Sequence, residues 1–179
     1  MMTARLRKFA LTAHVTSSVG WLGAVVVFVA LAVIALTSDD GQTVRGAYRV
    51  MEPLAWSVLV PLAFASLVTG VVQSLGTTWG LFRHYWILFK LLITAVATAV
   101  LLMYMGTLRL TGDVAADRSV NLDAVRNASP LLHAAAALVL LIVATTLSVY
   151  KPRGTTRFGQ RKQYEERAVS ATGDEASPA

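Results

Sequence analysis

Four long apolar runs constrain the fold of this 179-residue chain more than any other feature. They cover residues 9–36, 54–75, 86–108 and 131–150. At about 1.5 Å per residue, each run is long enough to cross about 30 Å of hydrocarbon as a helix. A hydrophobic fraction of 55% and a charged fraction of 15% agree with this. We therefore predict an all-α integral membrane protein, folded as a four-transmembrane-helix bundle.

Basic residues around these runs predict the orientation of the bundle. With both termini on the inner side, ten cations flank the runs on that side and five on the outer side, as the positive-inside rule requires. Most acidic residues fall in the two outer loops. The sequence therefore predicts an N-in/C-in, multi-pass protein of a bacterial inner membrane. The pI near 10.1 then reflects topology, and we do not expect nucleic-acid binding.

The chain divides at residue 150. Residues 1–150 are expected to form the transmembrane domain, and residues 151–179 a basic juxtamembrane segment followed by a disordered cytoplasmic tail. The first run follows three cations but is too long for a signal-peptide core, so we expect a retained span. The absence of cysteine excludes disulfides and thiol chemistry. No phosphate-binding loop, nucleophile elbow or zinc motif is present, which argues against nucleotide-dependent and soluble hydrolase chemistry.

Ionisable residues inside the runs are the first functional candidates, because a charged group at membrane depth is costly without a partner. His14 shares a helical face with Ser18 and Trp21, and Lys90 begins a stripe with Thr94. The other predicted inward faces are Ser66, Thr69, Gly70 and Gln73 in the second run, and His133, Ala137, Leu140 and Ala144 in the fourth. Pro61 is expected to kink the second run.

Depth along the helices separates two regions. Counting about 1.5 Å per residue, His14 and Lys90 both lie about 6 to 9 Å from the inner boundary, whereas His133 enters near the outer boundary. His14 and His133 are therefore about 15 Å or more apart, and one metal cannot bind both. The candidate cofactor-binding residues of the inner half are His14, Ser18, Trp21, Gln73, His84, Trp86 and Lys90. Lys90 is also the candidate catalytic residue, and His14 and His133 are the candidate metal ligands.

Structural roles compete with each of these assignments. His14 can simply donate to a backbone carbonyl or a serine of a neighbouring helix, and Lys90 can extend its apolar stem to the inner interface. His84 belongs to the segment FRHYW, which is typical of an interfacial belt of aromatic and basic residues. His133 is also close to an interface.

Methionines offer an alternative metal chemistry. Met103, Met105 and Met51, together with His133, form a candidate copper(I) set on the outer side, because thioether and imidazole suit that ion. Methionine is equally an ordinary packing residue in apolar helices.

Three segments resemble a known family. The segment HVTSSVGW, from His14 to Trp21, resembles the first span of the four-helix, haem-binding protoporphyrinogen oxidases of bacterial membranes, in which His precedes Trp by seven residues. The segment WILFK, ending at Lys90, is similar to that family's Trp and Lys spacing. RNASPLL and SVYKP, which begin at Arg126 and Ser148, resemble the family's last span. Copper resistance D domains share the His-to-Trp spacing in one span.

The resemblance implies a b-type haem in the bundle, with His14 as an axial ligand and Lys90 beside the propionates or a porphyrin substrate. Gln73 and Arg83 are further propionate candidates. One haem per chain is expected, with His14 alone or with His84 as the second ligand, and a second haem on His133 is possible geometrically. Ala128 replaces an acidic residue of the family, and VVVFVALAV replaces an aromatic, Pro and Arg group. These departures bear on oxidase activity more than on haem binding.

Three functional classes follow. The first is a haem-b membrane protein with a redox or porphyrin-handling role, which includes a protoporphyrinogen oxidase-like oxidoreductase with an unidentified electron-transfer partner. The second is a copper-binding or copper-transport protein. The third is a cofactor-free subunit of a membrane complex. Spans rich in Ala, Gly and Ser also allow a homo-oligomer.

Overall fold

A computed structural model of the chain describes residues 2–76, 84–150, 154–157, 159–161 and 164. The elements are α1 (Ala4–Thr37), α2 (Gly41–Leu54), the π-helical turn η1 (Ala55–Leu59), α3 (Val60–Gly76), α4 (Tyr85–Ala116), α5 (Leu122–Val125) and α6 (Ser129–Tyr150). Within these residues the only extended pairing is an isolated bridge between His84 and Thr155. The described fold is therefore helical throughout.

Four helical segments are long and apolar enough to span a membrane. They are Ala4–Thr37, Gly41–Gly76, Tyr85–Ala116 and Leu122–Tyr150. Large apolar side chains such as Val19, Leu92 and Leu132 are exposed on the outside of the bundle, as a lipid-facing surface requires. The structure confirms the predicted all-α, four-helix membrane bundle.

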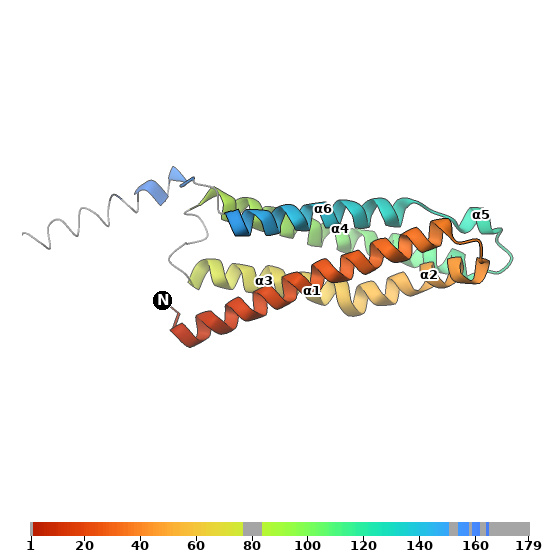
Figure 1. Ribbon diagram of the computed structural model, residues 1–179, viewed down its shortest axis with the longest axis horizontal. Helices are drawn as coiled ribbons and strands as arrows, with labels where there is room; N and C mark the ends of the chain where they lie inside the picture. Colours follow the sequence, from red (N-terminus) through yellow and green to blue (C-terminus); the bar gives the residue numbers. More distant parts are fainter. Residues whose placement is uncertain (1, 77–83, 151–153, 158, 162–163, 165–179) are drawn as a thin grey trace, which may run out of the picture.

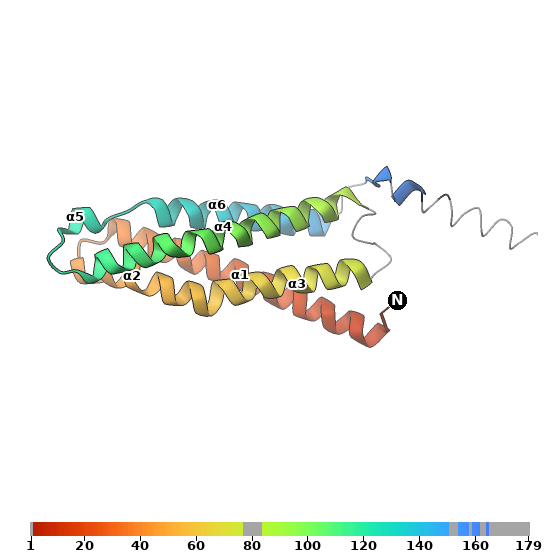
Figure 2. The same cartoon turned by 180° about the vertical axis from the view of Figure 1, so that it is seen from behind.

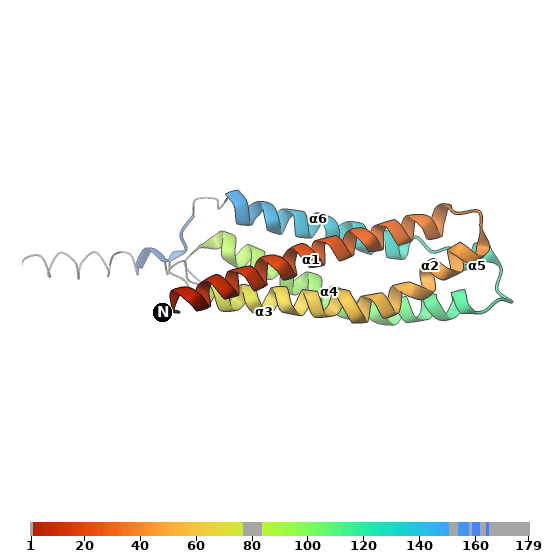
Figure 3. The same ribbon diagram turned by 60° about the horizontal axis from the view of Figure 1, so that its bottom comes forward.

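The helices run up and down in one elongated bundle (Figures 1 and 2). α1 packs against the α2–α3 segment on one side and against α6 on the other, and α4 packs against the same two neighbours. α1 and α4 are therefore diagonal to each other, as are the α2–α3 segment and α6. The start of α1 and the end of α6 lie at the same end of the bundle, which we call the inner end, whereas α5 lies at the opposite, outer end (Figure 3).

The second span begins well before its apolar run. α2 buries one face, Val44, Ala47, Tyr48 and Met51, while its other face is polar. This spacing is that of an amphipathic helix and not of an apolar run, so the expected start at residue 54 was 13 residues late. Asp40 caps the helix by accepting from the backbone N–H groups of Gln42 and Thr43. Hydrogen bonds from Thr43 hold the pKa of the Asp40 carboxyl below its ordinary value.

A wide turn connects α2 to α3. η1 lies between Pro53 and Pro61, and the N–H of Val60 bonds to the carbonyl of Ala55, five residues earlier. A proline has no N–H to donate and its ring crowds the preceding turn, so a π-helical turn relieves the crowding without breaking the helix. η1 ends two residues before Pro61, where the sequence predicts a kink.

Two arginines fasten the outer end. Arg45 donates to the carbonyls of Ala115, Asp117 and Val120 at the end of α4 and in the following loop. Arg126 donates to the carbonyls of Leu36 and Ser38 at the end of α1. The last carbonyls of a helix lack partners within the helix and carry the negative end of its dipole, so a cation there is favourable.

We predict that Arg45→Ala destabilises the protein. The change leaves three carbonyls without their charged donor, and hydrogen bonds of this kind each contribute about 1.5–3 kcal/mol. We expect a loss of about 2 kcal/mol in the free energy of unfolding, measured by denaturation of the protein in detergent. Arg109→Ala, which removes an exposed arginine of the neighbouring helix α4, is the control and should change the value by less than about 0.5 kcal/mol. Equal effects of the two changes would contradict this role for Arg45.

The orientation makes a second prediction. Because the sequence places nine cations near the two termini and five in the outer loops, a reporter fused after residue 179 should be active only on the cytoplasmic side. A reporter pair with opposite compartment requirements, fused at the same point, checks the result. Activity of the externally active reporter would invert the proposed topology.

Candidate functional site

Polar side chains gather in the inner half of the bundle, where the walls are otherwise apolar. We call this group the inner polar cluster, and it consists of His14 and Ser18 of α1, Ser66 and Thr69 of α3, and Lys90 of α4. Three different helices therefore supply it. Each residue belongs to the face that periodicity predicts to point inward.

His14 is the centre of the cluster and is 7% exposed. Its Nδ1 lies 3.1 Å from the Ser66 carbonyl oxygen and 3.1 Å from Thr69 Oγ1. A carbonyl can only accept, so Nδ1 carries the proton and donates to it. The Thr69 hydroxyl donates to the Ala65 carbonyl, which leaves its oxygen able to accept from the same Nδ1. The contacts thus select the Nδ1–H tautomer and hold the ring in place.

Lys90 occupies the other side of the imidazole. Its Nζ lies 3.1 Å from His14 Nε2, and in the Nδ1–H tautomer that nitrogen accepts from the ammonium group. The contact crosses the diagonal of the bundle from α4 to α1. Lys90 is half-buried, and its stem runs along apolar neighbours. The expectation that His14 and Lys90 lie at the same depth is confirmed by this contact.

The cluster contains no acid to balance Lys90. The acidic residues that the structure describes all lie in the outer part of the bundle: Asp39, Asp40, Glu52, Asp113, Asp117 and Asp123. Two basic groups thus lie side by side, with hydroxyls and carbonyls as their described partners. Such a pair favours an anionic group brought by a ligand.

Small residues allow the close approach of α1 and α3. Ser18 Oγ and Ser66 Oγ are 2.7 Å apart across the two helices. Gly70 faces the imidazole, and a Cβ at that position would lie 3.1 Å from His14 Cε1. A side chain at position 70 would therefore enter the space that the His14 imidazole occupies.

The other predicted inner residues lie further from His14. Trp21 is buried two helical turns along α1 and lines a separate cavity. Gln73 is half-buried on α3, one turn beyond Gly70. His84 is the residue before α4, where its ring faces that of Trp86 with centroids 6.4 Å apart. Among the predicted site residues, Lys90 is the one with a described contact to His14.

Some predictions lie outside the described residues. Arg83 belongs to residues 77–83, and most of the tail at 151–179 is likewise not described. Of the tail, Thr156 is buried and accepts from the backbone N–H of Gly159 through its side chain.

His133 belongs to the outer half. Its Nδ1 donates to the Ser129 carbonyl at 2.9 Å, and its ring stacks on Tyr104 with centroids 3.9 Å apart. The Tyr104 hydroxyl lies 2.8 Å from Ser129 Oγ. The buried face of α6 is Pro130, Ala134, Leu141 and Ala144, so His133 and Leu140 lie at its edge and not at its centre as the periodicity predicted. The reason is that α6 packs mainly against α1 and α4 among the described residues, and these two helices bury a narrow stripe of it.

The proposed copper ligands do not share a face. Met103 is 83% exposed, whereas Met105 is 5% exposed and Met51 is fully buried. Met103 and Met105 are two residues apart, which places them on opposite sides of α4. Among the described residues there is also no group of three or more His, Asp or Glu side chains that could hold a metal ion.

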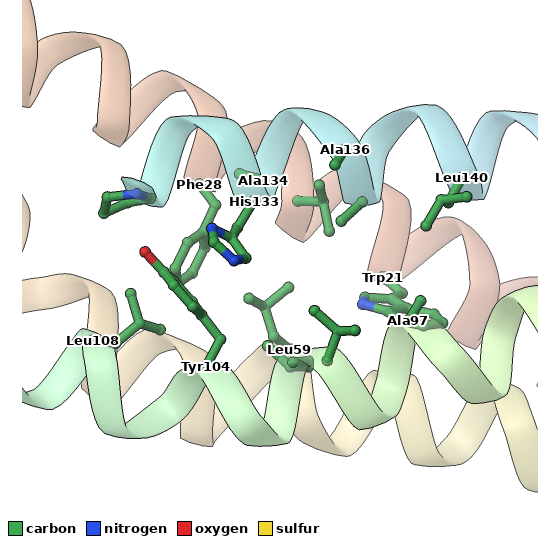
Figure 4. A pocket seen from close by; sticks show the side chains of 15 residues that line it. Trp21, Phe28, Leu59, Ala97, Tyr104, Leu108, His133, Ala134, Ala136 and Leu140 are labelled. Atoms are coloured by element: carbon green, nitrogen blue, oxygen red, sulfur yellow. The ribbon is translucent and has the colours of Figure 1, made fainter. Parts of the chain in front are cut away.

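A cavity of about 120 Å³ lies between α1, α4 and α6, toward the outer side of the inner polar cluster. Figure 4 shows His133 and Tyr104 at one end and Trp21 with Ala97 toward the other. The remaining walls are apolar, with Phe28 and Leu59 among them. No pattern in the sequence signals this cavity directly, because the cavity depends on which alanines of α6 face two other helices.

Ser66 and Thr69 are functional candidates that the sequence analysis did not select for the site. Both lie on the inward face predicted for the second run, from which only Gln73 is a predicted site residue. The sequence does contain one relevant signal, because a buried imidazole N–H needs an acceptor. The Ser66 carbonyl, three residues before Thr69, is that acceptor.

Comparison of the chain with family models, curated proteins and solved structures finds no match. The class of protein is therefore defined by the fold, a multi-pass helical membrane bundle with a basic polar cluster in its inner half.

The hydrogen bonds predict a specific tautomer for His14. In protein labelled with ¹⁵N-histidine, His14 should show a protonated Nδ1 and an unprotonated, hydrogen-bonded Nε2. Lys90→Met removes the donor to Nε2 and should move only that nitrogen's resonance to the position of a free imidazole nitrogen. His84→Ala, which does not touch this contact, is the control. A proton on Nε2 of His14 in the unaltered protein would contradict the arrangement.

Proposed function

We propose that this protein is a b-type haem-binding protein of a bacterial inner membrane, with a redox or porphyrin-handling role and His14 as the axial ligand. The observation that carries the proposal is the buried His14 imidazole, whose Nδ1–H is held by the Ser66 carbonyl so that Nε2 is the nitrogen left to bind. A ring N–H fixed by a carbonyl is the usual support of a metal-binding histidine.

The donor set of the inner polar cluster fits such a group. An axial imidazole, a cation for the propionates and apolar surroundings are the protein's contributions to a b-type haem site. His14 and Lys90 supply the first two, and the span faces supply the third. Bound haem would supply an iron able to exchange electrons or to bind a small gas.

Lys90 changes partners in this proposal. In the structure its Nζ contacts His14 Nε2. Lys90 must therefore move away from Nε2 before that nitrogen can bind a haem iron. Its four-carbon stem allows the ammonium group to turn toward a carboxylate while the stem stays packed.

The copper alternative has less support, because Met103 and Met105 point to opposite sides of α4. A cofactor-free bundle would need no histidine that presents an unprotonated nitrogen to a cation. The haem proposal therefore accounts for the most features of the described residues.

We expect His14→Gly to lower the bound haem per chain by at least about tenfold, since the iron loses its protein ligand. His84→Ala is the matched control and should keep the haem content and the Soret band, because His84 lies at the start of α4, away from His14. Haem is counted as the pyridine haemochrome of protein purified in detergent.

Free imidazole separates a ligand role from a folding role. Imidazole added to His14→Gly should restore haem binding, whereas a residue needed only for folding gives no such rescue. An unchanged haem content and spectrum in His14→Gly would exclude His14 as the ligand.

A further inference from the structure

The outer cavity opens toward the bilayer. Its walls between α4 and α6 include Val100 and Leu140, which are 45% and 36% exposed, and His133, which is also exposed. These lining residues are thus exposed on the side of the bundle formed by α4 and α6, within the spanning segments. A ligand that enters here comes from the hydrocarbon of the membrane.

One polar atom at the opening lacks a partner among the described residues. In the neutral imidazole of His133, Nδ1 carries the hydrogen that is donated to the Ser129 carbonyl, so Nε2 is an acceptor. The imidazole projects from α6 into the space between α6 and α4, and its stacking on Tyr104 keeps it there (Figure 4). An unprotonated nitrogen in an apolar wall favours a ligand that carries a hydroxyl hydrogen.

A donor faces the same cavity from its other end. Trp21 is 2% exposed, and its side chain lines the cavity. The indole nitrogen is on the side of the ring that faces the cavity (Figure 4). An indole N–H that reaches the cavity can donate to an oxygen of a ligand bound there.

We propose that the cavity binds the ring of a membrane-soluble hydroquinone. A hydroquinone has a flat apolar ring, a hydroxyl hydrogen for His133 Nε2 and an oxygen that can accept from Trp21. The volume of about 120 Å³ is of the size that holds a single six-membered ring. A phospholipid acyl chain would satisfy the apolar walls but would leave both polar atoms without partners. The binding site is independent of His14 and of any haem.

Binding is tested through Trp21 itself. In the variant Trp56→Phe/Trp79→Phe/Trp86→Phe, Trp21 is the only tryptophan, and its fluorescence reports a quencher in the cavity. The probes are a decyl-substituted benzohydroquinone, kept reduced under anaerobic conditions, and its oxidised quinone. The same titrations on the background of His14→Gly show whether the result is independent of haem.

Two changes and one control separate the possible outcomes. His133→Phe keeps a ring to stack on Tyr104 but removes the acceptor. It should weaken binding of the hydroquinone about tenfold and leave the quinone, which has no hydroxyl hydrogen, nearly unchanged. Ala137→Leu fills the cavity and should abolish saturable quenching by both probes, whereas Ala135→Leu, outside the lining, should not.

The proposal is overturned by either of two results. If His133→Phe leaves the affinity for the hydroquinone unchanged while Ala137→Leu abolishes binding, the cavity is a slot for apolar chains. If Ala137→Leu leaves quenching unchanged, the probes reach Trp21 from the surrounding detergent and not from the cavity.

Discussion

An imidazole and an ammonium group placed among membrane-spanning helices need polar partners, and the arrangement of the inner half of the bundle follows from that need. Hydrocarbon offers no water, so every hydrogen bond must come from the protein or from a ligand. The α3 helix supplies the Ser66 carbonyl and the Thr69 hydroxyl to one side of His14, and Lys90 of α4 contacts the other. This network links three of the four spans at one level.

Satisfying Nδ1 has a chemical consequence for Nε2. Once the first nitrogen of a neutral imidazole donates to a carbonyl, the second is an acceptor, and the fold directs it at Lys90. The same logic operates at His133, where the Ser129 carbonyl fixes the tautomer and leaves Nε2 toward the outer cavity. Nε2 of His14 and Nε2 of His133 are thus both acceptors, one in each half of the bundle. Lys90 contacts the first imidazole, and Tyr104 stacks on the second.

The number of spans and most of the inward faces could be predicted from the sequence. Apolar length determines a membrane span almost alone, and helical periodicity placed His14 and Lys90 on inward faces. The sequence analysis did not include α2 in the second span, because only one face of α2, from Val44 to Met51, is buried. The polar residues of the other face lower the mean hydropathy of this segment. The Ser66 carbonyl could not be identified as the partner of His14, because a backbone contact depends on how α1 and α3 are set against each other. The cavity beside His133 depends in the same way on the packing of α6.

The central claim is that the inner polar cluster holds a b-type haem through His14, and the visible spectrum of the purified protein tests it most directly. Oxidised and dithionite-reduced spectra, with a pyridine haemochrome count, should show a Soret band and about one haem b per chain, the content that a single axial histidine in each bundle predicts. A colourless protein that takes up no haem when titrated with haemin would contradict the claim, and the His14–Lys90 contact would then be a structural link between α1 and α4.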